Sequence, residues 1–334
     1  MTLHDERPRL RLRTVDDALG LIPHLLGFHP EESLVVLVVD GGQVAVTARI
    51  DLRDAVPPDG VEAVLERIWR RFPLADGWFV AYTDDHGAGW DVLGRCDAFL
   101  PPEARRRLTL VDGDTWWIDE PCGPVGRHDP GSSALAAEAT VHGLVARPSR
   151  SDVERLLDGP PEADLDHLVA VAERTGAELA QVKGRRWPGL MAAVLARCRL
   201  QGRLDDDGAA LLAALSTHPD ARDVALLSIS RADADQHVDL WRQVVNRTLP
   251  VHQGYPLALL GMAAWITGEG ALAAMCLERA ERLVPYSRLV GILSLVIEAV
   301  VPPTLWDDLR PELLATASTP VRRAAARPVS RAGR

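Results

Sequence analysis

The feature that most constrains the fold is the run Leu34–Val39, six consecutive residues without a polar side chain. Successive side chains of a strand point to opposite faces, so a strand of this composition must be buried on both sides. The Asp-Gly-Gly sequence at 40–42 predicts a hairpin turn, and residues 44–52 then alternate between apolar and polar. In the returning strand Val44 is expected to share the apolar face with Val46. The pattern therefore predicts a central strand, paired in a hairpin and covered by helices on both faces.

The segment before this strand carries the signals of a helix with defined ends. Thr14 and Asp17 form a capping box, in which the threonine hydroxyl caps the helix and the carboxylate reaches back. Gly27 suits the left-handed residue that ends a helix, and Pro23 lies within the span. A helix is therefore expected between Thr14 and Gly27.

Strand-like and helix-like segments alternate through the rest of the first half. The predicted order is helix 61–72, strand 78–82, helix 90–100, and a hairpin of strands 108–111 and 115–118. The proline- and glycine-rich residues 119–133 predict a long mobile loop. Residues 9–148 are therefore interpreted as an α/β domain with a mixed sheet and packed helices.

The second half is helical in pattern throughout, from a capping box expected at Ser151–Glu154 to residue 310. Helices are predicted near 152–158, 162–181, 187–200, 206–217, 220–231, 234–248, 254–268, 270–283 and 286–301. We interpret 150–310 as an all-helical domain, and the arginine-rich residues 320–334 as a disordered tail.

One helical pair, at 254–285, has a more specific spacing. Its residues fall on the positions of a tetratricopeptide repeat: Leu257, Leu260, Gly261, Ala264, Ala273, Leu277, Ala280 and Pro285. Small residues such as Gly261 would let the two helices approach closely. Because one copy is found where such arrays need about three, the pair is interpreted as a tetratricopeptide-like hairpin within a helical domain. An ordinary helical pair is the alternative.

Composition narrows the classes of function. The net charge is −10, and the five arginines of the last fourteen residues leave the body still more acidic. A nucleic-acid partner is therefore disfavoured, because such binding depends on neutralising phosphates. The four cysteines have no paired spacing, and no apolar run suggests a signal peptide or a membrane span. We expect a cytoplasmic protein without a metal site or cofactor.

The primary candidate site lies around the turn that precedes the apolar strand. His29 and Glu31 could supply an acid–base group, although a tight turn that binds its own backbone explains them as well. Arg49 and Asp51 share the polar face of the returning strand and form either a surface pair or, with His24 and His29, a ligand pocket. No nucleophile motif or phosphate loop accompanies these residues, so no catalytic residue is assigned.

Two secondary candidates lie further along the chain. Asp84, Asp85 and His86 follow the third strand, at the kind of sheet edge where α/β proteins place ligands, but such runs are also common solvated loops. Trp116 and Trp117 are adjacent in a strand, so one of them is expected to point outward beside the loop that follows. An outward tryptophan would suit a partner surface or a stacking ligand.

Several of these segments also carry a resemblance. Residues 23–36 (Pro-His-Leu-Leu-Gly-Phe-His-Pro-Glu-Glu-Ser-Leu-Val-Val), 49–52 (Arg-Ile-Asp-Leu), the tryptophan pair with Cys122-Gly123-Pro124, and Arg222-Asp223 resemble an actinobacterial family of domains of unknown function, number 4192. Residues 260–271 also resemble the corresponding segment of this family. The resemblance implies an actinobacterial, cytoplasmic, two-part protein. Because the family has no assigned activity, no catalytic role is carried over from it.

The favoured hypothesis is a non-enzymatic ligand-binding or adaptor protein. Its α/β half would present the pocket around His29, Arg49 and Asp51, and its helical half would bind a protein partner. A small-molecule ligand is compatible with this hypothesis. The alternative is a metal-assisted hydrolase or another small-molecule enzyme that uses His29 with Glu31, or Asp84 with His86.

Overall fold

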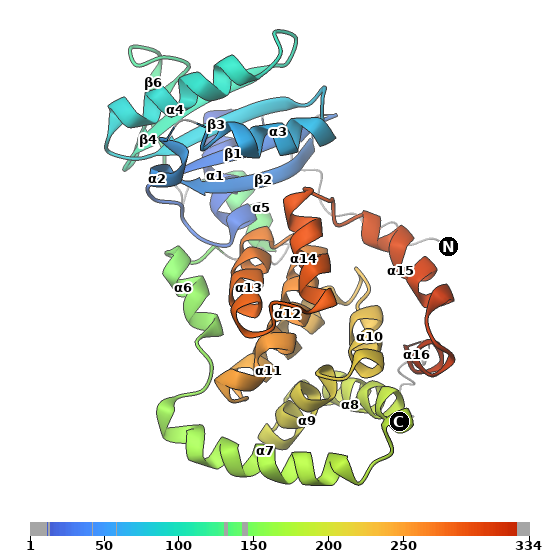
Figure 1. Cartoon of the computed structure of the whole chain (residues 1–334). Helices are drawn as coiled ribbons and strands as arrows, with labels where there is room; N and C mark the ends of the chain where they lie inside the picture. The colour runs from blue at the N-terminus through green and yellow to red at the C-terminus, as the bar shows by residue number, and fades with distance from the viewer. Residues whose placement is uncertain are drawn as a thin grey trace. The chain divides into compact units, whose positions relative to one another are not determined.

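The computed structural model of the chain describes residues 12, 14–41, 43–57, 59–129, 133–141 and 146–325. The chain divides into two compact units. The first is Met1–Val153 with the later segment Glu298–Pro302, and the second is Glu154–Ile297 with Pro303–Arg334. Figure 1 shows the α/β elements of the first unit and the helices of the second.

The first unit is built on a six-stranded sheet in the order β2-β1-β3-β4-β5-β6. The strands are β1 Ser33–Asp40, β2 Gln43–Asp51, β3 Asp76–Tyr82, β4 Arg106–Asp112, β5 Thr115–Ile118 and β6 Val125–Arg127. Among the described strands, β3 and β4 are the only parallel neighbours, and α4 (His86–Phe99) connects them. The sheet is therefore mixed, as the alternating pattern predicts.

The central position of the apolar strand is confirmed. β1 lies between β2 and β3, and its residues Leu34 to Val38 are all fully buried. Leu34, Val36 and Val38 pack into a core with Leu65 of α3 (Glu62–Arg71) and residues of α4. Val35 and Leu37 are buried on the opposite face, the side on which Figure 1 shows α1 and α5. Burial on both faces leaves no room for a polar side chain in this run.

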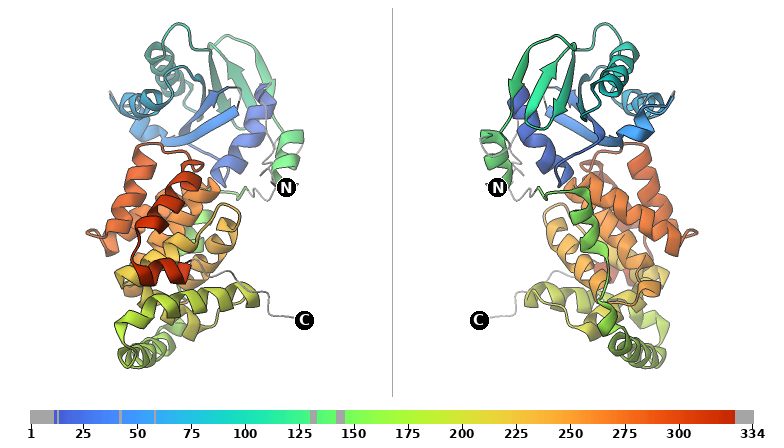
Figure 2. Two further views of the ribbon diagram at one scale, coloured as in Figure 1. Left: turned by 90° about the vertical axis from the view of Figure 1, so that its right-hand side faces the viewer. Right: turned by 90° about the vertical axis from the view of Figure 1, so that its left-hand side faces the viewer.

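The other described helices of this unit are α1 Val15–Leu26, α2 Leu52–Ala55, α5 Ala134–Val141 and, at the boundary between units, α6 Arg150–Glu154. The capping box of α1 is confirmed, since Thr14 Oγ1 accepts from the amide of Asp17 at 3.1 Å and Asp17 Oδ2 accepts from the amide of Thr14 at 3.0 Å. Gly27 ends α1 at a φ of 81°. α1 and α5 lie side by side (Figure 2). Gly20 leaves the space that the Ser133 side chain fills.

Four local predictions for this unit are wrong. A β-bulge between Val38 and Val39 pairs Val39 with Val44, so Val44 does not share a face with Val46. Residues 119–133, expected to be a loop, contain β6, which pairs with β5. α4 begins at His86 because Asp85 caps it. The capping box before α6 uses Ser149 and Asp152 rather than Ser151 and Glu154.

The second unit is all-helical, as expected. Its α-helices are α7 Leu165–Ala180, α8 Trp187–Gln201, α9 Asp206–Ser216, α10 Pro219–Ser228, α11 Ala234–Asn246, α12 Gly254–Thr267, α13 Gly270–Leu283, α14 Arg288–Glu298, α15 Leu305–Thr316 and α16 Thr319–Ala325. Short 3₁₀ turns precede several of them.

The predicted helical pair at 254–285 exists as α12 and α13, which pack together. A methyl group at Gly261 would lie 3.1 Å from Cβ of Cys276 in α13 and 2.5 Å from Leu293 in α14. Gly261 therefore permits the close approach of two neighbouring helices. The relation of the pair to tetratricopeptide repeats stays a prediction.

The predicted tail needs a correction at its start. Residues 319–325 form α16, in which Val321 is 1% exposed and Ala324 is 6% exposed. These two side chains pack with α8 and α10, and that burial compensates for the low apolar content of the segment. The remaining residues of the predicted tail lie outside the described part of the chain.

Candidate functional site

The register of the sheet brings three polar side chains into one row. Ser33 of β1 is paired with Asp51 of β2 on one side and with Tyr82 of β3 on the other. Directly opposed residues of antiparallel strands project to the same face. Arg49 lies two residues before Asp51 on β2 and therefore shares that face. We refer to Ser33, Arg49, Asp51 and Tyr82 as the strand-end cluster.

Arg49 is the most heavily contacted member of the cluster. Its Nη2 donates to Asp51 Oδ1 at 2.7 Å and to the carbonyl oxygen of Glu31 at 3.3 Å. Its guanidinium lies over the ring of Phe28, 5.7 Å from the centroid. The Arg49 side chain is 12% exposed. These contacts hold the guanidinium between the returning strand and the turn that precedes β1.

Asp51 faces more than one basic group. Besides Arg49, guanidinium nitrogens of Arg53 and Arg150 lie 3.8 and 3.7 Å from its Oδ2. Arg53 is largely exposed, so its share of the interaction is weakened by solvent. Three guanidinium groups thus meet around one carboxylate, in a chain whose overall charge is negative.

Three polar atoms of the cluster are enclosed without a hydrogen-bond partner among the described residues. They are Ser33 Oγ, Arg49 Nε and Tyr82 Oη. Burial raises the pKa of the Tyr82 phenol, so the group keeps its proton. An unsatisfied buried polar group costs about 1–3 kcal/mol, and a water or a ligand commonly occupies such a place. Two hydroxyls and one N–H donor are therefore available at this end of the sheet.

The turn between α1 and β1 is fixed by backbone contacts. The amide of His29 donates to the carbonyl of Arg147 at 3.0 Å, and the amide of Arg147 donates to that of Gly27 at 2.8 Å. The Glu32 carboxylate accepts from Thr83 Oγ1 at 3.1 Å, and Glu32 has a φ of 40°. The left-handed conformation is unusual for a glutamate, so the turn is held firmly where it meets the cluster.

The two predicted histidines lie close enough to influence each other. Burial lowers the pKa of His29 first, and the positive charge of His24 lowers it further, while Glu31 acts in the opposite direction. A third imidazole, His128, also responds to His29, although burial is the main reason why its own pKa is lowered. The pKa values of His29 and His128 are thus both lowered, so these two imidazoles favour the neutral form.

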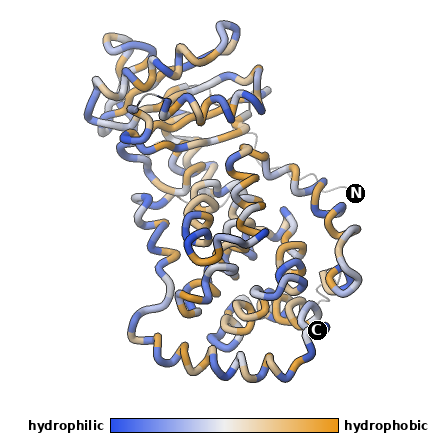
Figure 3. Tube along the Cα trace, viewed as in Figure 1, coloured by the Kyte–Doolittle hydropathy of each residue, from blue (hydrophilic) through white to orange (hydrophobic). Residues whose placement is uncertain are grey.

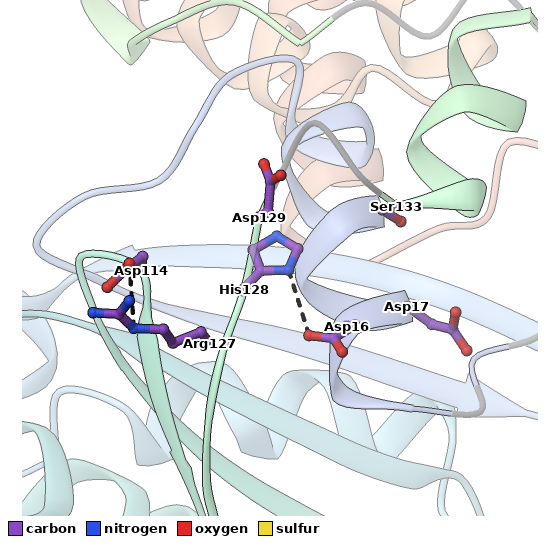
Figure 4. A pocket seen from close by; sticks show the side chains of 7 residues that line it. All are labelled: Asp16, Asp17, Asp114, Arg127, His128, Asp129 and Ser133. Carbon is purple, nitrogen blue, oxygen red and sulfur yellow. Dashed lines mark ion pairs between the residues drawn. The ribbon is translucent and has the colours of Figure 1, made fainter.

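His128 lines a pocket of about 420 Å³ beside α1 (Figure 4). The lining residues are Asp16, Asp17, Asp114, Arg127, His128, Asp129 and Ser133. His128 Nδ1 lies 3.6 Å from Asp16, Arg127 lies 3.7 Å from Asp114, and Ser133 caps α5. The pocket therefore carries four carboxylates against one guanidinium, whereas the carboxylate of Asp51 in the strand-end cluster faces three guanidiniums.

The side chains of the secondary candidates Asp85 and His86 contact neighbouring groups of the protein. Asp85 Oδ1 accepts from the amide of Ala88 at 3.0 Å and caps α4. His86 Nε2 lies 3.1 Å from Asp112 Oδ2, and its ring meets Trp117 edge-on at 4.7 Å. Asp84 is exposed and accepts from the His86 amide through its carbonyl oxygen. The side chains of Asp85 and His86 are thus directed to different partners.

The paired tryptophans project to opposite faces of β5, as the alternation predicts, but neither of them is exposed. Trp117 packs on the core beneath α4, and Trp116 projects to the other face against Gly126. Both side chains are half-buried, because β6 adds a strand beyond β5 and gives Trp116 a neighbour. Among the described residues, no three His, Cys, Asp or Glu side chains are grouped to hold a metal ion.

Sequence reasoning places Arg49, Asp51, Glu31, His24 and His29 in one region, and the structure brings their segments together. Sequence reasoning does not single out Ser33 or Tyr82 as site residues. A hydroxyl at the first position of an otherwise apolar strand is the signal that points to Ser33. The strand pairing that identifies Tyr82 is not visible in a single sequence.

The comparisons with known proteins bear on the whole chain. The model of the family described as Domain of unknown function (DUF4192) matches residues 16–304. The chain matches no curated protein and no solved structure. No helix among the described residues is long and apolar enough to cross a membrane.

Proposed function

The chain belongs to the DUF4192 family, and we propose that it is a cytoplasmic, non-enzymatic binding protein whose α/β unit takes a small ligand at the strand-end cluster. The observation that supports this proposal most directly is the set of unpartnered atoms Ser33 Oγ, Arg49 Nε and Tyr82 Oη. They come from three neighbouring strands and share one face. A ligand at this place would satisfy donors that the protein leaves unsatisfied.

The chemistry of the donors defines the class of ligand. Arginine Nε can only donate a hydrogen bond, and the two hydroxyls can donate as well. The group that meets them must therefore be an acceptor. The guanidiniums of Arg49, Arg53 and Arg150 around Asp51 favour an acceptor with negative charge. A carboxylate or a phosphate on a small molecule fits this description.

Calorimetric titration with acetate, citrate, inorganic phosphate and adenosine monophosphate tests the proposal at constant ionic strength. We expect one of these probes to bind the wild-type chain. Arg49→Lys should weaken that binding at least about tenfold, because lysine keeps the charge but places no donor at the Nε position. Ser33→Ala and Tyr82→Phe should each weaken it by a smaller factor.

A matched control lies on the same sheet. Arg106 of β4 forms an ion pair with Asp97, also at 2.7 Å, away from the cluster. Arg106→Lys should leave the affinity for the probe unchanged. Equal affinities of the wild type, Arg49→Lys and Arg106→Lys would contradict the proposal, and so would a failure of all four probes to bind.

The second part of the proposal is a protein partner for the helical unit. Several apolar side chains there are exposed, including Tyr286 at 100% and Leu295 at 63%. Tyr286 lies just before α14 and Leu295 within it, and exposed apolar groups are the surface that a protein partner would cover. A partner recovered by affinity capture from the native host should be lost with the double variant Tyr286→Glu and Leu295→Glu. Its retention by that variant would exclude these two residues as its binding surface.

A further inference from the structure

The helical unit contains a cavity of about 280 Å³. None of the candidate site residues described above lines this cavity. It lies between α7, α9, the start of α8 and the connection from α11 to α12. The lining residues are Leu168, Val171, Ala172, Gly176, Leu179, Trp187, Ala210, Ala213, Ala214, Thr217, Arg247, Thr248, Leu249 and His252. Most of them are apolar.

Small side chains create the cavity. Apolar and polar residues alternate along α7 (Figure 3), and its apolar face turns toward α9. On that face Gly176 has nothing within 4 Å of the place where a Cβ would stand. The facing side of α9 presents Ala210, Ala213 and Ala214. Gly176 is exposed, so the cavity opens to solvent there, and the small side chains of these four residues leave its space unfilled.

The polar groups inside the cavity are already satisfied by the protein. Thr217 Oγ1 donates to the carbonyl of Ala214 at 2.7 Å, and Thr248 Oγ1 donates to that of Val244 at 2.8 Å. The indole N–H of Trp187 donates to the carbonyl of Val182 at 3.1 Å. The interior thus offers an apolar surface, on which water finds few partners.

The rim differs from the interior because it is basic. Arg247 Nη1 lies 3.3 Å from Asp206 Oδ1, and this is the one side-chain partner that the described residues give it. Among the described residues Asp206 accepts from no other guanidinium, and its Oδ2 lies 3.2 Å from His167 Nε2. A guanidinium carries five N–H donors, so Arg247 retains donors for a second acceptor. His252 lies exposed beside it.

We propose that this cavity binds a small amphiphilic anion, with its apolar body among α7, α8 and α9 and its carboxylate on Arg247. The volume lies near the lower limit of about 300 Å³ for ligand pockets, so the apolar body must be short. An apolar interior with one cationic group at its mouth is the arrangement that fixes the orientation of such a ligand. This site is separate from the strand-end cluster and does not depend on it.

Three probes with the same eight-carbon tail test the proposal: octanoate, 1-octanol and octylamine, each below its micellar concentration. In calorimetric titration of the full chain, octanoate should bind about tenfold or more tightly than 1-octanol. Octylamine should bind most weakly of the three. Arg247→Gln should lower the affinity for octanoate to that for 1-octanol and leave the affinity for 1-octanol within about twofold.

Filling the cavity tests its location. Ala214→Leu places an apolar side chain into the space and should abolish binding of octanoate and of 1-octanol alike. The matched control is Ala170→Leu, the same change at an exposed position on α7, which should leave both affinities unchanged. Circular dichroism and the thermal midpoint identify any variant that fails to fold, and Ala210→Leu then replaces Ala214→Leu.

Two results would overturn the proposal. One is octanoate affinity that persists in a folded variant with the cavity filled, since binding would then occur elsewhere. The other is equal affinity for the three probes together with no effect of Arg247→Gln, since the carboxylate would then have no recognised partner. Absence of octanoate binding to the wild-type chain also contradicts it.

Discussion

The strand-end cluster and the start of α4 resemble each other in sequence and differ in structure. Each consists of charged and hydroxyl side chains next to a buried strand. At the start of α4, Thr83, Asp85 and His86 all have partners, because a helix end supplies amides and β4 supplies Asp112. At the strand end, three enclosed polar atoms have none among the described residues. Residue types alone therefore do not separate a satisfied helix cap from an unsatisfied polar cluster; the count of satisfied hydrogen bonds does.

The largest effect should come from Arg49→Met. Methionine keeps the apolar contact with Phe28 but leaves Asp51 with only weaker guanidinium neighbours. Breaking a fully buried ion pair costs about 3–5 kcal/mol, and the partial exposure of Asp51 reduces this to roughly 2 kcal/mol. Urea unfolding measures the change. A loss below about 0.5 kcal/mol would place Arg49 among ordinary surface pairs.

Loss of the capping side chains at the start of α4 should lower the free energy of unfolding by a smaller amount. Asp85→Ala should destabilise the chain by about 1 kcal/mol, the usual value for an N-cap carboxylate. Thr83→Val should cost about the same, because Thr83 Oγ1 donates to Glu32 and accepts from the Asp85 amide. Urea unfolding again gives the change, and Asp85→Asn should retain most of the stability.

Loss of the hydroxyls of the strand-end cluster should differ most clearly from loss of the α4 caps in its effect on stability. Ser33→Ala and Tyr82→Phe remove groups that have no partner among the described residues, so without ligand neither should lower the free energy of unfolding by more than about 0.5 kcal/mol. The bound probe should stabilise these variants less than the wild type. A loss of about 1 kcal/mol or more without ligand would show that the hydroxyls are satisfied within the folded protein.

The smallest expected effect concerns protonation of His29. Its pKa is lowered by burial and by His24, so replacing His24 by Ala should raise it. Glu31→Gln should lower it further, because the carboxylate stabilises the charged imidazole. Proton NMR titration of the imidazole signals measures both shifts. Because the folded pKa is lowered, the contribution of His29 to stability is present above pH 6.5 and decreases as the pH falls below that value.

Much of the first unit follows from local pattern. The apolar run gives β1 its central place because a strand of this composition is stable only when both faces are buried. Thr14, Asp17 and Gly27 predict the ends of α1 because caps act within a few residues. The alternation along β2 alone predicts that Arg49 and Asp51 share one face.

Elements that depend on contacts between segments distant in sequence are not predictable from local pattern. β6 is three residues long and has one exposed valine at its start, so its existence depends on β5. The alignment of Tyr82 with Ser33 follows from antiparallel pairing of strands that lie far apart in sequence. α16 is arginine-rich and reads as tail sequence, but Val321 and Ala324 bury themselves on α8 and α10.

The segment Glu298–Pro302 belongs to the first unit, and Val300 packs against its core. This side chain is thus synthesised only after helices α7 to α13 of the other unit. A nascent chain that ends before residue 300 should bury its sheet incompletely, and a protease added during translation should cut the α/β unit until that segment arrives.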